Sequence, residues 1–201
     1  MNTMKNNAMI AIFLAAILAF SPLAGFAQAT TFSGQAIGVK ANALGISLSV
    51  SDTGALPSSG GNLSTSVASV NVAGLVSADA LKSTTSGSGT SSQSQASVAH
   101  VNLLNGLITA DVVKSNSSAT CSGTTASTSG SAQIVNLVAA GQTITVAPNL
   151  AVSLPGGISL IVDEQTSSSG GNTGSITVNG LHVTGPAIDI IVSSAHSDIT
   201  C

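Results

Sequence analysis

The sequence contains neither tryptophan nor tyrosine, and only one of its four phenylalanines, Phe32, lies beyond the first 29 residues. Aromatic side chains bury the largest areas in most protein cores. A core in this chain must therefore be built from valine, isoleucine, leucine and alanine. The same lack removes the stacking platforms that single-stranded nucleic acids need and the aromatic platforms that are common in lectins.

Charge is equally scarce, at 5% of the residues against about 25% in typical soluble proteins. Arginine is absent, and the cations beyond Lys5 are Lys40, Lys82 and Lys114, which stand against seven acidic residues. Because nucleic-acid binding depends on basic patches, we expect no nucleic-acid partner. Disordered chains have low hydrophobicity, whereas the mean hydropathy here is positive, so the chain is expected to fold or assemble.

The first 29 residues have the organisation of a secretory signal peptide. Met1–Asn7 carries one positive charge, Ala8–Phe20 is apolar, and Ala27-Gln28-Ala29 offers small residues for cleavage. The apolar run is shorter than a membrane-spanning helix requires. We therefore expect a mature chain of residues 30–201 that forms one domain. It would have no membrane span after cleavage and would be secreted, extracellular or held at the cell surface.

The mature chain has two cysteines, Cys121 and Cys201. In an oxidising compartment such a pair favours a disulfide. The bond would stabilise the fold by about 4–5 kcal/mol through loop closure and would hold a chain end that otherwise tends to fray. Two free thiols are the alternative, and a metal site is disfavoured because no Cys-x-x-Cys spacing occurs.

Apolar and polar residues alternate with a period of two through most of the mature chain, and turns rich in Gly, Ser, Thr and Asn separate the segments. Valine, isoleucine and threonine, which favour strands, are abundant. The segments SVNVAGLVSADALKS (Ser69–Ser83) and HVNLLNGLITADVVKS (His100–Ser115) echo each other, but later Val-Asn copies are unevenly spaced, unlike a regular solenoid. The pattern predicts an all-β domain, an antiparallel β-sandwich built from long hairpins, with a β-solenoid as the alternative.

The second of these segments predicts a hairpin in detail. A two-residue type I′ turn at Asn105-Gly106 places six paired residues on the buried face: Leu103 with Ile108, Val101 with Ala110, and Ala99 with Val112. The same register puts His100 opposite Asp111 on the solvated face, where a polar cross-strand pair is worth about 0.2–1 kcal/mol. A three-residue turn would shift this register.

The first segment argues that His100 belongs to the scaffold. A three-residue loop, Val72-Ala73-Gly74, would pair Val70 with Val76 and Ala68 with Ala78. Ser69 then occupies the position of His100. A side chain that is absent from the equivalent position of the other copy is a weak candidate for catalysis.

Catalytic, cofactor-binding and metal-binding patterns are missing. No Gly-x-Ser-x-Gly elbow accompanies the histidines, so we predict no catalytic residues and no cofactor. An extended final strand would put His196, Asp198 and Thr200 on one face, as a weak metal site or, with better support, a solvated strand. Asp163-Glu164 would point to opposite faces and is expected to mark a strand end or a sheet edge.

Several motifs together resemble the choice-of-anchor P family of bacterial secreted surface proteins. They are GLITADVVKSNSSATCSG, VNLVAAGQTITVAPN, LPGGISLIVDEQ, GSITVNGLHVT and IIVSSAHSDITC, and they span roughly Ala68 to Cys201. The resemblance implies an extracellular or surface protein, implies no reaction, and favours pairing of the two cysteines. No LPxTG-like motif or apolar tail precedes Cys201, which favours free secretion or non-covalent association over covalent anchoring.

These observations predict a non-enzymatic extracellular or cell-surface protein with a structural or adhesive role. A ligand-binding module for glycans or small molecules is the alternative, and a secreted hydrolase is less favoured. Low charge and high β-propensity also allow self-association into fibres through strand edges. A smooth surface covered by Ser and Thr favours the structural role, and a concave pocket lined by His, Asp and Asn favours the alternatives.

Overall fold

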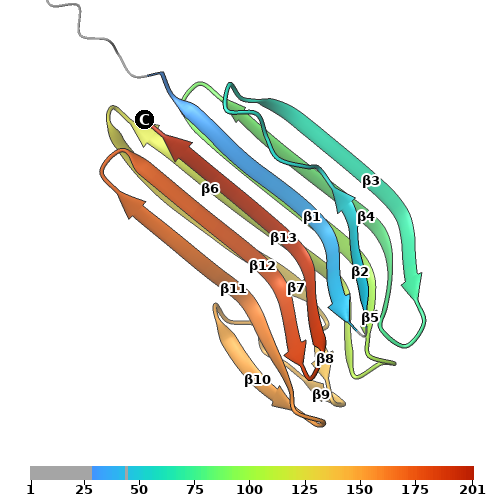
Figure 1. The fold of residues 1–201 in the computed structure, drawn as a ribbon. Coiled ribbons are helices and arrows are strands. Elements are labelled where there is room, and N and C mark those ends of the chain that lie inside the picture. The colour runs from blue at the N-terminus through green and yellow to red at the C-terminus, as the bar shows by residue number, and fades with distance from the viewer. Residues whose placement is uncertain (1–28, 44) are drawn as a thin grey trace, which may run out of the picture.

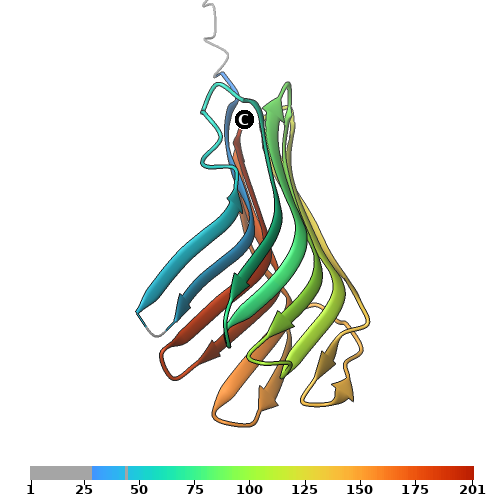
Figure 2. The ribbon, with the colours of Figure 1, turned by 90° about the vertical axis from the view of Figure 1, so that its right-hand side faces the viewer.

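The computed structural model describes residues 29–43 and 45–201. The predicted signal peptide thus lies almost entirely outside the described residues. Within them the chain forms thirteen β-strands and no helix, arranged as two antiparallel sheets that pack face to face (Figures 1 and 2). The prediction of an all-β antiparallel sandwich is confirmed, and the solenoid alternative is wrong. None of the described segments is a helix that is long and apolar enough to cross a membrane.

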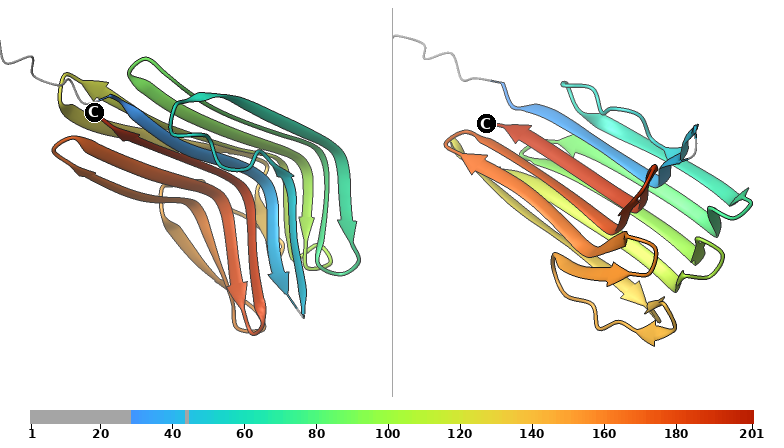
Figure 3. Two further views of the ribbon diagram at one scale, coloured as in Figure 1. Left: turned by 45° about the horizontal axis from the view of Figure 1, so that its top comes forward. Right: turned by 60° about the horizontal axis from the view of Figure 1, so that its bottom comes forward.

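The sheets are named A and B here. Sheet A contains, in spatial order, β10 (Leu150–Leu154), β11 (Ile158–Gly170), β12 (Thr173–Gly185), β13 (Ile188–Thr200), β1 (Thr31–Ala43) and β2 (Ile46–Asp52). Sheet B contains β3 (Gly61–Val72), β4 (Val76–Ser88), β5 (Ser91–Leu103), β6 (Ile108–Ser122), β8 (Val138–Ala139) and β9 (Gln142–Thr143), and β7 (Thr125–Val135) also pairs with β6. The first and last strands of the described chain are neighbours, with Thr31 opposite Thr200 (Figure 3).

The long strands change direction at one level of the sandwich, which we call the bend line (Figures 1 and 3). Its residues are Gly38, Ser51, Ala80, His100, Asp163, Gly180 and Ser193, and the regular ladder pairing is interrupted at these positions. The five that are not glycine have positive φ, between 46° and 61°. Side chains alternate between the two faces of a sheet only where the backbone is extended. A single left-handed residue therefore shifts the alternation, and beyond it the residues that would have pointed inward point outward.

On one side of the bend line lies an aliphatic half, which supplies most of the apolar core. Its largest buried side chains come from both sheets and are Val101, Leu103, Ile108, Leu160, Leu181 and Ile190. Because no aromatic residue contributes here, the sheets meet through branched aliphatic side chains, as the composition requires. This half matches the predicted inward stacking of aliphatic residues.

On the other side lies a hydroxyl half, in which buried serine and threonine side chains fill the space between the sheets. They are Ser83, Thr85, Ser92, Ser94, Ser115, Ser117 and Ser197. The composition predicts a core of valine, isoleucine, leucine and alanine, and in this half that prediction is wrong. A buried hydroxyl must be hydrogen-bonded to be tolerated, and the facing sheet provides the acceptors.

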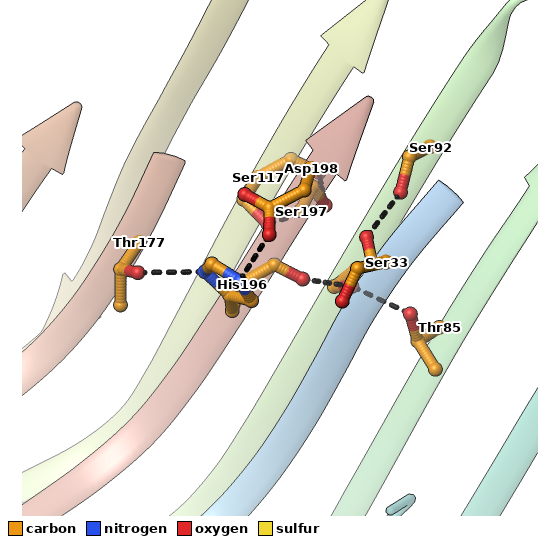
Figure 4. Close-up of polar contacts among 9 residues, drawn as sticks. Ser33, Thr85, Ser92, Ser117, Thr177, His196, Ser197 and Asp198 are labelled. Atoms are coloured by element: carbon orange, nitrogen blue, oxygen red, sulfur yellow. Dashed lines mark hydrogen bonds and ion pairs between the residues drawn. The ribbon is translucent and has the colours of Figure 1, made fainter. Parts of the chain in front are cut away.

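Hydrogen bonds between the sheets satisfy these hydroxyls, except that Thr85 Oγ1 pairs with Ser94 Oγ of the same sheet at 2.7 Å (Figure 4). Ser94 Oγ donates to the carbonyl oxygen of His196 at 2.6 Å, and Ser115 Oγ donates to that of Ser193 at 2.6 Å. In the opposite direction, Ser193 Oγ donates to the carbonyl oxygen of Ala96 at 3.0 Å. Side chains this short bring the two backbones close together. A Cβ added to Gly34, for example, would lie 2.6 Å from Thr85 Oγ1.

A disulfide between Cys121 and Cys201 closes the far end of the hydroxyl half, with 5.6 Å between the two Cα atoms. A small apolar cluster surrounds it, formed by Phe32, Leu56, Ala119, Ala126 and Ile199. The disulfide joins β6 of sheet B to the residue that follows β13 of sheet A. The predicted cysteine pairing is thus confirmed, and it ties the two sheets together within the smaller of the two apolar clusters.

Candidate functional site

The hairpin of β5 and β6 has the predicted register near its turn. Leu103 pairs with Ile108 and Val101 with Ala110, and Asn105 and Gly106 both have the positive φ of a type I′ turn. Beyond the bend line the predicted faces are wrong. Val98 and Val113 are buried there, in place of Ala99 and Val112, because His100 with φ of 50° interrupts the alternation.

The predicted contact between His100 and Asp111 is replaced by two others. His100 Nδ1 lies 3.5 Å from Asp79 Oδ2 of β4, and both side chains are mostly exposed. Asp111 Oδ2 accepts a hydrogen bond of 2.6 Å from Asn136 Nδ2. The left-handed backbone at His100 turns its side chain toward β4, which the hairpin register alone does not reveal.

In the earlier hairpin, formed by β3 and β4, the predicted register is also wrong. Its turn is three residues long as predicted, but it contains Leu75 and begins after Val72, so Val70 pairs with Ala78 and not with Val76. Leu75 is buried within the turn. Burying that leucine decides the register, and Ser69 consequently faces Asp79.

On the outer face of sheet A, a hydroxyl, an imidazole and a carboxylate form a chain of contacts (Figure 4). Thr177 Oγ1 lies 2.8 Å from His196 Nδ1, and His196 Nε2 lies 3.0 Å from Asp198 Oδ2. Thr177 and His196 are cross-strand partners on β12 and β13. Thr200, which the sequence places on the same face, belongs to none of these contacts.

This order of groups is that of a nucleophile, a base and an orienting acid. Acyl transfer also needs N–H donors aimed at the developing oxyanion. Thr177 lies inside β12, which pairs with β11 on one side and β13 on the other. The neighbouring backbone N–H groups are therefore engaged in the sheet ladder, and the arrangement holds two strands together.

A second polar cluster surrounds His182 on the same outer face. Its Nδ1 lies 2.9 Å from Glu164 Oε2, and its Nε2 lies 3.1 Å from Asp189 Oδ1. Asn179 Nδ2 also donates to Glu164 Oε2 at 2.7 Å. These contacts join β11, β12 and β13. Among the described residues, no three His, Cys, Asp or Glu side chains are grouped so that they could hold a metal ion.

Asp163 and Glu164 do point in different directions. Glu164 takes part in the outer cluster, whereas Asp163 is buried and accepts a hydrogen bond of 2.8 Å from the backbone N–H of Ala132 on β7. Gln165 Nε2 donates to the same carboxylate. Asp163 therefore accepts a hydrogen bond between the sheets from within β11, and its predicted role as the mark of a strand end or sheet edge stays a prediction.

Asp52 ends β2 and accepts hydrogen bonds from three different residues. Gln35 Nε2 donates to it at 2.7 Å, Ser49 Oγ at 2.9 Å and the Gly54 N–H at 2.9 Å. Burial alone would raise the pKa of Asp52. The hydrogen bonds from Gln35, Gly54 and Ser49 and the charge of Lys40 outweigh burial, and the pKa lies below its ordinary value.

We predict that Asp52→Asn makes the stability less sensitive to acid. A carboxyl whose pKa is lower in the folded state stabilises the fold above its unfolded pKa of about 3.9, and this contribution is lost as the pH falls through the folded value. The free energy of unfolding, measured by denaturant titration from pH 7 to pH 2, should fall more for the unmodified protein than for the variant. Asp111→Asn, on sheet B, is the control. Parallel curves for Asp52→Asn and the unmodified protein would contradict the prediction.

An open groove of about 450 Å³ lies in the hydroxyl half, on the outer face of sheet B, across β4, β5, β6 and β7. Two rungs of cross-strand neighbours line it. One rung is Thr84, Gln95, Asn116 and Ser131, and the other is Ser86, Gln93, Ser118 and Ser129. We call this the sheet B groove. All eight side chains are uncharged, and each carries a hydrogen-bonding group.

No motif or charge in the sequence singles out these eight residues. The signal for them is the segment SSQSQAS, in which each glutamine is flanked by small residues. Alternation then sends the glutamines to one face and the serines to the other. Because both faces are polar, the pattern does not say which of them is buried.

Comparisons with family models, curated proteins and solved structures find no match for this chain. The resemblance to choice-of-anchor P proteins therefore stays a prediction.

Proposed function

We propose that this protein is a non-enzymatic structural or adhesive module that works outside the cell or at the cell surface. The observation that carries the proposal is the contact between the sheets in the hydroxyl half. Hydroxyl-to-carbonyl hydrogen bonds run across it in both directions, and the Cys121–Cys201 disulfide closes its end. Such a contact makes a stiff body, and an oxidising compartment preserves its disulfide.

The environment of the histidines supports a role without catalysis. His196 and His182 each place both ring nitrogens against hydroxyl or carboxylate partners on neighbouring strands. Their contacts stabilise the outer face of sheet A. Thr177 has the position of a nucleophile but sits within the paired ladder of an interior strand, away from free N–H donors.

A ligand-binding module is the second candidate, and the sheet B groove favours it. Its lining of amides and hydroxyls is exposed on a broad face, as an adhesive surface would be. The two candidates are compatible, because an adhesive protein also needs a surface that recognises something.

The proposal is tested by locating the protein in the bacterium that produces it. We expect antibodies to detect it in the medium or the envelope fraction, digestible by protease added to intact cells. Its mass should be two hydrogens below that of the reduced chain. Deleting the gene should reduce attachment or cell-to-cell cohesion without removing a hydrolytic activity. A cytoplasmic, fully reduced protein, or loss of such an activity, would overturn the proposal.

A further inference from the structure

We infer that the sheet B groove binds an uncharged glycan chain, oriented across the strands. This inference deepens the proposed function and rests on its adhesive form. The groove has the volume of a ligand site, and its eight outward side chains offer both hydrogen-bond donors and acceptors without a formal charge. A ligand rich in hydroxyl groups and free of charge is the complement of such a lining.

The geometry of the lining fixes the direction of the chain. Each rung contains one side chain from each of four neighbouring strands, and neighbouring strands lie about 4.8 Å apart. That step is close to the length of one pyranose unit in an extended glycan. A chain lying along the rungs therefore meets a new amide or hydroxyl with nearly every sugar.

Gln95 and Asn116 form the centre of the site. Gln95 Nε2 donates to Asn116 Oδ1 at 2.7 Å, which holds the two amides in a fixed orientation. In the described part of the chain, the Oε1 acceptor of Gln95 and the Nδ2 donors of Asn116 have no other partner. Two vicinal hydroxyls of a sugar can donate to the first and accept from the second.

Charged side chains lie outside the groove. Lys82 and Lys114 occupy the next rung, on either side of Ser97. On each of these strands an acidic residue, Asp79 or Asp111, lies three residues before the lysine, on the side away from the groove, so the formal charges of each strand near that border sum to zero. An acidic glycan would gain little electrostatic attraction there, and a neutral glycan loses no binding energy.

The absence of aromatic side chains sets the strength of binding. Without a ring to cover the apolar face of a sugar, affinity must come from hydrogen bonds that replace bonds to water. We expect a dissociation constant of about 1 mM for a short oligosaccharide. Polymers and clustered copies of the protein bind more tightly through multivalency, which suits adhesion.

Affinity electrophoresis of the purified mature chain tests the inference. Gels contain hydroxyethylcellulose, galactomannan or dextran as neutral probes and polygalacturonate as the acidic probe. We expect at least one neutral probe to retard the protein. The double variant Gln95→Ala/Asn116→Ala should weaken binding to that probe by about tenfold, the effect of losing one or two hydrogen bonds. Gln133→Ala, on the Lys114 rung of the same face outside the groove, should leave it unchanged.

Several results would overturn the inference. One is that no neutral probe retards the protein. A second is that the double variant is retarded as much as the unmodified protein while its circular dichroism melt is unchanged. A third is that polygalacturonate retards the protein more strongly and that this effect disappears in Lys82→Gln/Lys114→Gln. A dimer seen by light scattering and lost in the double variant would assign the groove to a second copy of the chain. Surface exposure and cell attachment without glycan binding would leave the proposed function standing and remove only this ligand.

Discussion

Replacing both cysteines by alanine is expected to lower the free energy of unfolding by about 4.5 kcal/mol, because the Cys121–Cys201 bond closes a loop with a sequence separation of 80 residues. For a domain of this size the melting temperature should fall by roughly 9–18 °C. The bond joins the two sheets beside the smaller apolar cluster. Its loss should therefore free the end of β13 before the aliphatic half unfolds.

Thermal and urea unfolding followed by circular dichroism measure this effect, since the sequence has no tryptophan or tyrosine for fluorescence. Reducing the unmodified protein with dithiothreitol should give the same loss, which separates the bond from any cavity left by alanine. Ser122→Ala, next to Cys121, is the control and should stay within about 0.5 kcal/mol. A loss below about 1 kcal/mol in both the variant and the reduced protein would show that the disulfide contributes little to the native fold.

Gly180→Val is expected to cost about 3 kcal/mol, at the upper end of what overpacking costs. Gly180 lies on the bend line of β12 and faces sheet B. Even a Cβ at this position would overlap Val113 Cγ1 and would lie 3.1 Å from Ser115 Oγ and from the carbonyl oxygen of Val192. Valine adds two methyl groups to that overlap. The sheets would have to separate, which would also break the Ser115 hydrogen bond to Ser193.

Gly170→Ala is the matched control, because a Cβ there meets no atom within 4 Å and its φ is not in the left-handed region. The control should unfold like the unmodified protein or with slightly higher stability. Urea unfolding of the two variants compares them directly. Equal midpoints for Gly180→Val and Gly170→Ala would mean that the sheets do not approach each other as closely as described.

Sequence alone predicted the strands, the antiparallel sandwich and the cysteine pair, because these depend on local alternation and on compartment. It also predicted the turn at Asn105-Gly106, whose two residues favour left-handed backbone. The bend line was not predictable in this way. Ser51, His100 and Ser193 adopt positive φ, which such residues adopt only occasionally, and no local motif marks them. Tertiary packing imposes the bend.

The candidate sites were also only partly predictable from the sequence, because they depend on contacts between strands. The hairpin register predicts a His100–Asp111 pair, and this prediction is wrong because the left-handed residue at the bend line directs His100 to Asp79. The contacts among Thr177, His196 and Asp198 depend on the pairing of β12 with β13. These strands form one hairpin, but its two-residue turn, Pro186-Ala187, lacks the Asn-Gly or Gly-x sequence that marks such a turn. The sheet B groove depends on four strands in register. Because serines lie on both faces of these strands, the sequence does not show which serines line the groove and which are buried between the sheets.

The two halves of the sandwich should respond differently to cooling and to force. Apolar burial weakens as temperature falls, whereas the bonds from Ser94, Ser115 and Ser193 to facing carbonyls are directional and do not depend on that effect. Sliding one sheet over the other would stretch these bonds all at once, while the aliphatic contact offers no fixed positions to resist shear. The serine-rich end is therefore expected to keep its resistance to shear on cooling, while the contact in the aliphatic half weakens.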